Sequence, residues 1–333
     1  MNPTRPVQFG IIGVGRIAAN AFAPALAAAT NAELSAAASR ELARAQALKP
    51  PRAYGSYDEL LDDDDVEVVY IGTHNGLHRS LAVAAFERGK HVLCEKPLAC
   101  DAAECAEMVA AARQHSRHLA EAFMYRHHPS IAEARRLVLD GAIGELRTVE
   151  GTFSFRLEKL DDVRLNPAWG GGGLLDVGCY CVNACRYFFD GMPERVTGLG
   201  LFHPEHDVDM ALHGVLEFPQ RRFGVISCGF DGGRRNRIVL CGTHGTLTLP
   251  SGFGVSNRAV SIVLEAGEDR REITFEPQDV YRLQIEDFAR AVRGSQPLLP
   301  PDDGWRNARV MDALLASARA GGTPQTLEPR DEI

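Results

Sequence analysis

The chain has 333 residues, of which 45% are hydrophobic and 24% are charged, and its formal net charge is −8 at pH 7. This length accommodates two domains that each bury a hydrophobic core. The negative charge argues against nucleic-acid binding, and no apolar run approaches the roughly 20 residues of a membrane span. We also expect no signal peptide, because the first six residues carry a single basic residue and lead into an apolar segment. The eight cysteines form no Cys-x-x-Cys pair, which favours free thiols and a cytoplasmic protein.

A glycine-rich turn between a strand and a helix predicts a dinucleotide site near the start of the chain. Residues 7–12 are typical of a strand, Gly13-Val14-Gly15-Arg16-Ile17-Ala18 follows at once, and an alanine-rich helix runs to about residue 29. Here the first glycine permits the tight turn, the second permits close approach of the pyrophosphate, and the alanine packs helix on strand. We therefore assign Gly13, Gly15, Arg16 and Ile17 to cofactor binding.

The end of the second predicted strand bears on the choice of cofactor. Residues 33–38 form this strand and lead into Ser39-Arg40. A site for NAD usually has an acidic residue at this position, which binds the ribose hydroxyls. A short hydroxyl followed by arginine suits the 2′-phosphate of NADP instead. These residues favour NADP, and Glu41, one position later, keeps NAD as an alternative.

Two further strands bring polar residues to their carboxyl ends, where open α/β sheets bind ligands. Residues 66–72 lead into Thr73-His74-Asn75 and His78, which we assign to the cofactor site, although a single histidine is more often structural. Residues 91–94 lead into Glu95-Lys96-Pro97, where proline ends the strand and holds the lysine at the sheet edge. We add Glu95 and Lys96 to the site.

The remaining elements predict an α/β fold with an N-terminal Rossmann domain and a C-terminal α+β domain. In the first domain we expect helices at 81–88 and 102–114 and a last strand at 118–126. The second has a helix at 131–139 and a large, open, mainly antiparallel sheet. Its strands are predicted at 146–157, 195–202, 210–218, 222–230, 236–241, 245–249, 260–265 and 271–275. We place the domains at 1–126 and 127–333, and expect C-terminal helices at 281–293 and 303–318 to pack back on the sheet or the first domain.

A second glycine-rich segment leads into a helix with polar residues on one face. Trp169 and four glycines precede Leu174, and a helix from there places Asp176, Tyr180 and Asn183 at positions i, i+4 and i+7. We interpret the glycines as a mobile lid.

The sequence predicts no metal site. The close histidine pairs, His127-His128 and His203/His206, come with no convincing carboxylate or thiolate set at ligand spacing. The acidic run at residues 62–65 is typical of a solvated loop.

Taken in order, these motifs resemble the glucose–fructose oxidoreductase / inositol dehydrogenase / MocA (Gfo/Idh/MocA) family over almost the whole chain. Residues Glu121–Pro129 and Gly171–Asn183 resemble its dihydrodiol dehydrogenase and xylose-type aldose dehydrogenase branch. The inositol dehydrogenase branch has histidine where this chain has Tyr180, so we do not expect an inositol-type histidine dyad. His74 replaces a proline that family members commonly carry.

The resemblance implies an NAD(P)-dependent enzyme that moves a hydride between nicotinamide and a carbohydrate or diol, with Lys96 and Tyr180 beside the reacting carbon. A proton must also leave or reach the alcohol oxygen. Tyrosine, with a pKa near 10, becomes a usable base only if nearby positive charge lowers that pKa. Asp176 would orient a substrate hydroxyl or the lysine. The predicted substrate-binding residues are Arg126, His128, Trp169, Asp176 and Asn183.

Two alternatives remain at this stage. One is a sugar-nucleotide ketoreductase, and the other is a non-catalytic dinucleotide-binding regulator on the same fold. The presence of Lys96, Asp176 and Tyr180 favours an enzyme. We expect a homodimer or homotetramer formed through the C-terminal sheet, and no nucleic-acid or membrane partner.

Overall fold

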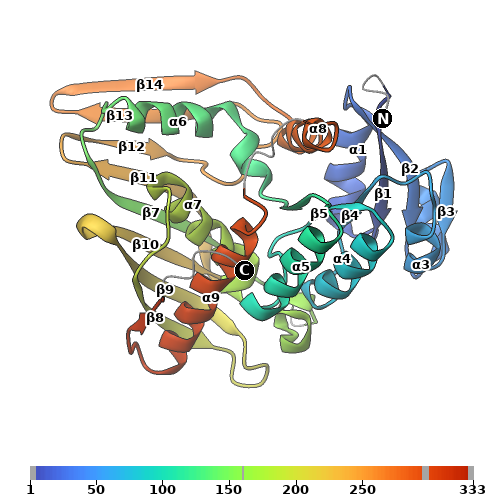
Figure 1. The fold of residues 1–333 in the computed structure, drawn as a ribbon. Helices are drawn as coiled ribbons and strands as arrows, with labels where there is room; N and C mark the ends of the chain where they lie inside the picture. Colours follow the sequence, from blue (N-terminus) through green and yellow to red (C-terminus); the bar gives the residue numbers. More distant parts are fainter. Residues whose placement is uncertain (1–4, 160, 295–299, 329–333) are drawn as a thin grey trace. The chain divides into compact units, whose positions relative to one another are not determined.

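A computed structural model describes residues 5–159, 161–294 and 300–328 (Figure 1). The chain packs as two units. Among the described residues, the first comprises those up to 124 together with 279–305, and the second comprises 125–278 together with 306–328. The assignment of cofactor binding to residues 1–126 and of substrate binding to residues 127–333 remains a prediction.

The first unit is built on a six-stranded parallel sheet with the strand order β3-β2-β1-β4-β5-β6. The order reverses between β1 and β4, which is the arrangement of a Rossmann fold. The predicted N-terminal fold is thus confirmed. Its strands are β1 (Val7–Ile12), β2 (Ala32–Ala38), β3 (Arg52–Tyr54), β4 (Val68–Ile71), β5 (His91–Cys94) and β6 (Leu119–Glu121).

Helices connect these strands. They are a π-helical turn Ala18–Phe22 that continues as α1 (Ala23–Ala27), α2 (Leu42–Ala47), α3 (Tyr57–Leu61), a 3₁₀ turn Asn75–Leu77, α4 (His78–Glu87) and α5 (Ala102–Gln114). A further helix of this unit, α8 (Val280–Val292), comes much later in the chain, after the strands of the second sheet. The sequence did not predict α2, β3 or α3. The strand predicted at 118–126 is shorter because Glu121 pairs with Cys94, the last residue of β5, and the residues beyond have no strand to pair with. A 3₁₀ turn, Met124–His127, follows instead.

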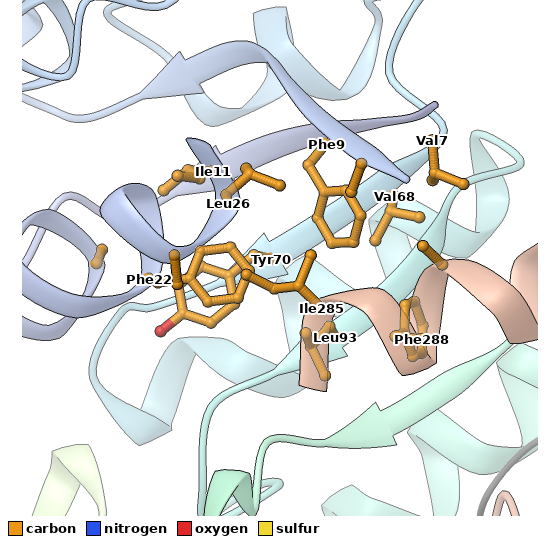
Figure 2. Packing of buried hydrophobic residues seen from close by; sticks show 14 of the residues in the cluster. Val7, Phe9, Ile11, Phe22, Leu26, Val68, Tyr70, Leu93, Ile285 and Phe288 are labelled. Carbon is orange, nitrogen blue, oxygen red and sulfur yellow. The ribbon is translucent and has the colours of Figure 1, made fainter. Parts of the chain in front are cut away.

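The core of this unit joins the start of the chain to a helix close to its end. Figure 2 shows Ile285 and Phe288 of α8 among side chains of β1, β4 and β5. Tyr70 stacks on Phe22 with 3.6 Å between ring centroids. The helix α8 is therefore part of the hydrophobic layer beneath the Rossmann sheet.

The second unit contains a nine-stranded sheet in the order β14-β13-β12-β11-β7-β10-β9-β8-β15. Only β7 and β10 pair in parallel among these neighbours, so the predicted, mainly antiparallel sheet is confirmed. The strands are β7 (Leu146–Arg156), β8 (Arg195–Phe202), β9 (Asp209–Phe218), β10 (Arg222–Gly229), β11 (Asp231–Gly242), β12 (Gly245–Leu249), β13 (Val260–Ala266), β14 (Asp269–Phe275) and β15 (Gln325–Thr326).

Helices cover one face of this sheet. They are α6 (Pro129–Leu139), beside β13 in Figure 1, α7 (Cys179–Phe189) on β7 and β10, and α9 (Asp303–Arg319), whose first three residues belong to the first unit. Short 3₁₀ turns lie at Val163–Leu165, Pro167–Trp169 and Pro219–Arg221, and the segment Leu174–Gly178 before α7 is a π-helical turn. The helix α7 lies so close to the strands that a Cβ at Gly151 would come 2.9 Å from that of Cys181. No helix of the described residues has the length and apolar character that crossing a membrane requires.

The opposite face of the sheet carries exposed apolar side chains. They alternate with buried residues along β8, β9 and β10, as the two-residue period of a strand dictates. Phe223 is 40% exposed and Leu199 is 60% exposed. The full set is Leu199, Leu201, Val215, Phe223 and Val225, and we call it the apolar sheet face.

The glycine run before Leu174 packs tightly. A Cβ at Gly171 would lie 2.5 Å from the carbonyl oxygen of Arg164, and one at Gly172, where φ is +116°, would collide with the Asp209 carboxylate. Gly172 also donates its N–H to the Arg164 carbonyl at 2.9 Å. Close packing therefore explains these glycines, contrary to the predicted mobile lid.

Asp209 fixes the point at which the next helical segment begins. Its side chain is buried, and Oδ2 accepts a hydrogen bond from the N–H of Leu174 at 2.6 Å. Burial raises the pKa of Asp209 to about 7. The turn Leu174–Gly178, continued by α7, thus starts on a buried carboxyl group, and this segment carries Asp176 and Tyr180.

The raised pKa of Asp209 predicts a pH-dependent stability. Between about pH 4 and pH 7 the carboxyl is ionised in the unfolded chain and protonated in the folded one, so stability falls as the pH rises through this range. Asp209→Asn cannot ionise and should remove this contribution, which is worth up to roughly 4 kcal/mol. Urea unfolding midpoints at pH 4.5–8 should therefore shift in favour of the asparagine variant as the pH rises. Parallel curves for the two proteins would contradict this assignment.

Candidate active site

The first predicted cofactor element is the turn after β1. Gly13 has φ +86°, and a Cβ there would lie 2.7 Å from Cγ2 of Thr73, so the backbone requires glycine. Gly15 is exposed, and a Cβ there would make only an ordinary 3.6 Å contact. The protein itself does not require glycine at this second position, which fits a need for close approach by a ligand. Arg16 and Ile17 are exposed beside it.

The residues that follow β2 and β4 share an edge of the sheet. Arg40 is exposed and makes no hydrogen bond or ion pair with any residue of the described chain, while Glu41 pairs with Arg44 at 3.0 Å. The pKa of His74 is lowered, chiefly by burial and further by the positive charge of Arg40. Ser39 is buried, and its hydroxyl accepts a 3.4 Å hydrogen bond from the N–H of Glu41. An exposed, uncompensated arginine beside this strand end suits a phosphate group.

His78 has a positioning role. It is completely buried, and its two ring nitrogens lie 3.0 Å from the Pro97 carbonyl and 3.3 Å from that of Thr73. Burial lowers its pKa to about 4, so the ring is neutral at pH 7. The imidazole links the loop after β4 to the turn after β5, and it has no exposed surface with which to contact a cofactor. Thr73 and Asn75 remain partly exposed.

The turn that carries Lys96 is fixed by buried partners. Glu95 accepts a hydrogen bond from the hydroxyl of Tyr70 at 2.8 Å and another from the N–H of Lys96 at 3.2 Å. Beyond the cis Lys96–Pro97 bond, the N–H of Leu98 donates to Glu121 at 2.9 Å. The lysine therefore lies between two anchored residues at the carboxyl end of β5, as its position in the sequence predicted.

Tyr180 lies in the second unit within an aromatic cage. Its side chain is 5% exposed, and the ring centroids of Phe153, Phe253 and Tyr125 lie at 5.4, 5.6 and 5.9 Å from its own. These contacts fix the phenol ring. Lys96 belongs to the first unit, so its predicted pairing with Tyr180 stays a prediction.

Two of the predicted substrate residues are enclosed in the second unit. Asn183 is fully buried, and its side-chain oxygen accepts the hydroxyl of Tyr125 at 2.7 Å. His128 is also fully buried and caps α6 by accepting the N–H of Ser130 at 3.0 Å. Their contacts support neighbouring elements. The sequence had not identified Tyr125, since its link to Asn183 spans 58 residues.

The other predicted substrate residues lie nearer the surface. Trp169 is 38% exposed in the turn Pro167–Trp169. The guanidinium of Arg126 lies 5.1 Å from the ring centroid of Tyr187. Asp176 is bound by Arg164, whose Nε donates to Oδ2 at 2.6 Å. No local pattern in the sequence indicated Arg164.

The described residues contain no group of three or more histidine, cysteine or acidic side chains arranged to hold a metal ion. Within the acidic run, Asp63 accepts the hydroxyl of Tyr54 at 3.1 Å and lies 2.8 Å from Arg52.

Two family models match the chain. Residues 7–123 match "Oxidoreductase family, NAD-binding Rossmann fold", and residues 131–248 match the "GFO/IDH/MocA C-terminal domain". Together they cover more than half of the chain.

Curated relatives extend this similarity. The chain is 38% identical to D-xylose 1-dehydrogenase (NADP(+)) 2 of Haloferax volcanii over 322 residues, which cover 95% of this chain and 98% of that protein. It is 37% identical to trans-1,2-dihydrobenzene-1,2-diol dehydrogenase of Xenopus laevis over 251 residues, or 73% of this chain and 75% of that one.

Solved structures agree in fold and family. An aldose-aldose oxidoreductase from Caulobacter crescentus, complexed with glycerol, superposes with a TM-score of 0.89 at 28% identity, covering 97% of this chain and all of that one. A 3-ketoreductase from Actinomadura kijaniata, in complex with NADP and TDP-benzene, gives 0.87 at 28% identity over 94% and 98% of the two chains. The chain thus belongs to the Gfo/Idh/MocA family of NAD(P)-dependent oxidoreductases, which its motifs resembled.

Proposed function

We propose that the protein is an NADP-dependent dehydrogenase or reductase of an aldose or a related diol. The observation that carries this proposal is the 38% identity to an NADP-dependent xylose dehydrogenase across nearly the full length of both chains. The test is to measure NADP- and NAD-linked oxidation of a panel of aldoses, dihydrodiols and inositols. Turnover of an aldose or dihydrodiol with NADP is the expected result.

A second candidate is the reduction of a keto group on a nucleotide-linked sugar. The similarity to the 3-ketoreductase that binds TDP-benzene favours it. NADPH-dependent reduction of a TDP-linked keto sugar, with no oxidation of free aldoses, would select this function over the first.

The chain offers residues suited to each part of NADP. Gly13, Gly15, Arg16 and Ile17 would surround the pyrophosphate, because backbone N–H groups at a helix start favour anions. Ser39 and Arg40 would hold the 2′-phosphate, and Thr73, His74 and Asn75 would line the same edge. Bound NADP supplies the acceptor or donor of the hydride.

We assign the proton transfer to Tyr180. A tyrosinate at this position would take up the hydroxyl proton when the alcohol is oxidised, and the phenol would return it in the reverse direction. The aromatic cage lowers the local polarity, which disfavours the phenolate unless a positive charge lies nearby. Lys96 would provide that charge, and Asp176 would orient a substrate hydroxyl.

We also propose a homo-oligomer that buries the apolar sheet face. Five large apolar side chains exposed on three adjacent strands form a surface typical of an interface. A cytoplasmic location is proposed as well, because all eight cysteines are free thiols.

The first prediction concerns cofactor choice. Arg40→Ala should weaken NADP binding by roughly 1.5–3 kcal/mol, the value of a charge-assisted hydrogen bond, and leave NAD binding nearly unchanged. Titration calorimetry with both cofactors measures this. Arg44→Ala is the matched control, since Arg44 is exposed on the next helix and already paired with Glu41. Equal losses for both cofactors would refute the assignment.

The second prediction concerns proton transfer. Tyr180→Phe should lower kcat by about 10²–10⁴ with little change in cofactor affinity, because only the transferable proton is lost. Lys96→Met should do similar damage, and the double variant should be little worse than either single one. Steady-state kinetics and NADP titration measure these effects.

Tyr187→Phe is the control for this set, because it removes a hydroxyl from the same helix. Near-normal turnover of Tyr180→Phe would move the acid–base role to another group. Full additivity in the double variant would separate the roles of Lys96 and Tyr180.

The third prediction concerns assembly. Val215→Glu places a charge in the middle of the apolar sheet face and should shift the protein towards monomers in sedimentation experiments, because a symmetric interface contains the substitution twice. Leu139→Glu is the control, since Leu139 is 73% exposed at the end of α6. An unchanged assembly for Val215→Glu would place the interface elsewhere.

A further inference from the structure

Arg164 is held rigidly between two carboxylates in the second unit. Its Nε donates to Oδ2 of Asp176 at 2.6 Å, and its Nη1 donates to Oδ1 of Asp162 at 3.1 Å. Asp162 also accepts the backbone N–H of Arg164 at 3.0 Å, which caps the turn Val163–Leu165. The guanidinium carbon lies 5.7 Å from the ring centroid of Phe155. The orientation of the guanidinium plane is therefore fixed.

One nitrogen of this guanidinium remains available. Among the residues that the structure describes, Nη2 has no hydrogen-bond acceptor, and the Arg164 side chain is 26% exposed. Because the guanidinium is planar, Nη2 lies on the same edge as Nε, next to the carboxylate of Asp176. That donor, without a partner in the described chain and on a partly exposed side chain, thus lies beside a carboxylate that is itself partly exposed.

A donor and an acceptor side by side match a hydroxyl group. A hydroxyl accepts one hydrogen bond and donates another, whereas a carbonyl oxygen only accepts and an alkyl group does neither. The net charge of Arg164, Asp162 and Asp176 together also affects which ligand can bind. The two carboxylates outweigh the arginine by one negative charge, so the group favours a neutral polar ligand over a phosphate or carboxylate.

Asp176, which binds Arg164, lies on the same helical segment as Tyr180, the proposed proton-transfer residue. Tyr180 follows Asp176 by four residues, across the junction between the π-helical segment Leu174–Gly178 and α7, and both were predicted to face the substrate. If the phenol contacts the reacting oxygen, a hydroxyl held by Asp176 and Arg164 lies one helical turn away. Side chains one turn apart are neighbours on the helix surface and can converge on two oxygens carried by adjacent carbons.

We propose that Arg164, together with Asp176, binds the substrate hydroxyl on the carbon next to the one that is oxidised. Arg164 is then a specificity-determining residue that selects vicinal diols over isolated alcohols. This inference rests on the proposed function and deepens it. The 1- and 2-hydroxyls of an aldose and the two hydroxyls of a dihydrodiol both meet the requirement, so one site accounts for both substrate classes.

The test compares substrates that differ only in the adjacent hydroxyl. The pairs are D-xylose with its 2-deoxy analogue, and trans-cyclohexane-1,2-diol with cyclohexanol. In the wild-type protein kcat/KM should be about 10- to 100-fold higher for the diol, because a hydrogen bond to a charged group is lost with the hydroxyl. In Arg164→Met the ratio should fall to within about threefold, with NADP affinity unchanged.

Arg136→Met is the matched control, because Arg136 also bridges two carboxylates, Glu133 and Asp140, on the exposed side of α6. It should keep the wild-type ratio. Arg164→Gln retains an amide donor and should restore part of the preference, and it replaces the methionine variant if circular dichroism shows that the latter is misfolded.

Each outcome decides the matter. Equal losses on both members of a pair in Arg164→Met would assign the arginine a structural role and overturn the inference. Equal wild-type rates on both members would overturn it without any variant. An absence of wild-type NADP-linked turnover on every compound would overturn the proposed function, and the inference with it.

Discussion

The contact between the buried carboxyl of Asp209 and the N–H of Leu174 determines where the helical segment with the proposed catalytic residues begins. The carboxyl occupies the space that a side chain at Gly172 would need. Position 172 must therefore be glycine for Asp209 to reach the N–H of Leu174. The segment that starts here carries Asp176 and Tyr180 in sequence. A shift of its first residue by one position would rotate both side chains around the helix axis and away from their present direction.

The first unit uses the same kind of support. Lys96 is partly exposed, and the residues on either side are held by the buried Tyr70 hydroxyl and the partly buried carboxylate of Glu121. His78 then joins the loops that follow β4 and β5. In the first unit, Tyr70 and Glu121 form hydrogen bonds with the residues that flank Lys96. In the second, Asp209 accepts a hydrogen bond from the backbone at the start of the segment with Asp176 and Tyr180. Such support preorganises the functional group.

Much of the fold could be predicted from the sequence because its signals are local. Strand alternation and the turn at Gly13 depend on neighbouring residues, and β12 and α5 lie where they were expected. The supporting contacts are not local. Asp209 lies 35 residues from Leu174, and Tyr125 lies 58 from Asn183. The glycine run was misread for the same reason, since the group that packs against it is distant in the chain.

Burying a polar side chain such as that of Asp209 lowers the stability of the fold, but the hydrogen bond that it makes fixes the position of its partner. The pKa of Asp209 rises because burial disfavours its charged form, so the protein gives up stability to keep a carboxyl in this place. An apolar side chain would avoid that cost, but apolar contacts tolerate sliding and rotation. A hydrogen bond of 2.6 Å has one direction and one partner. For the helix proposed to present Asp176 and Tyr180 to the substrate, that directionality would offset the stability lost.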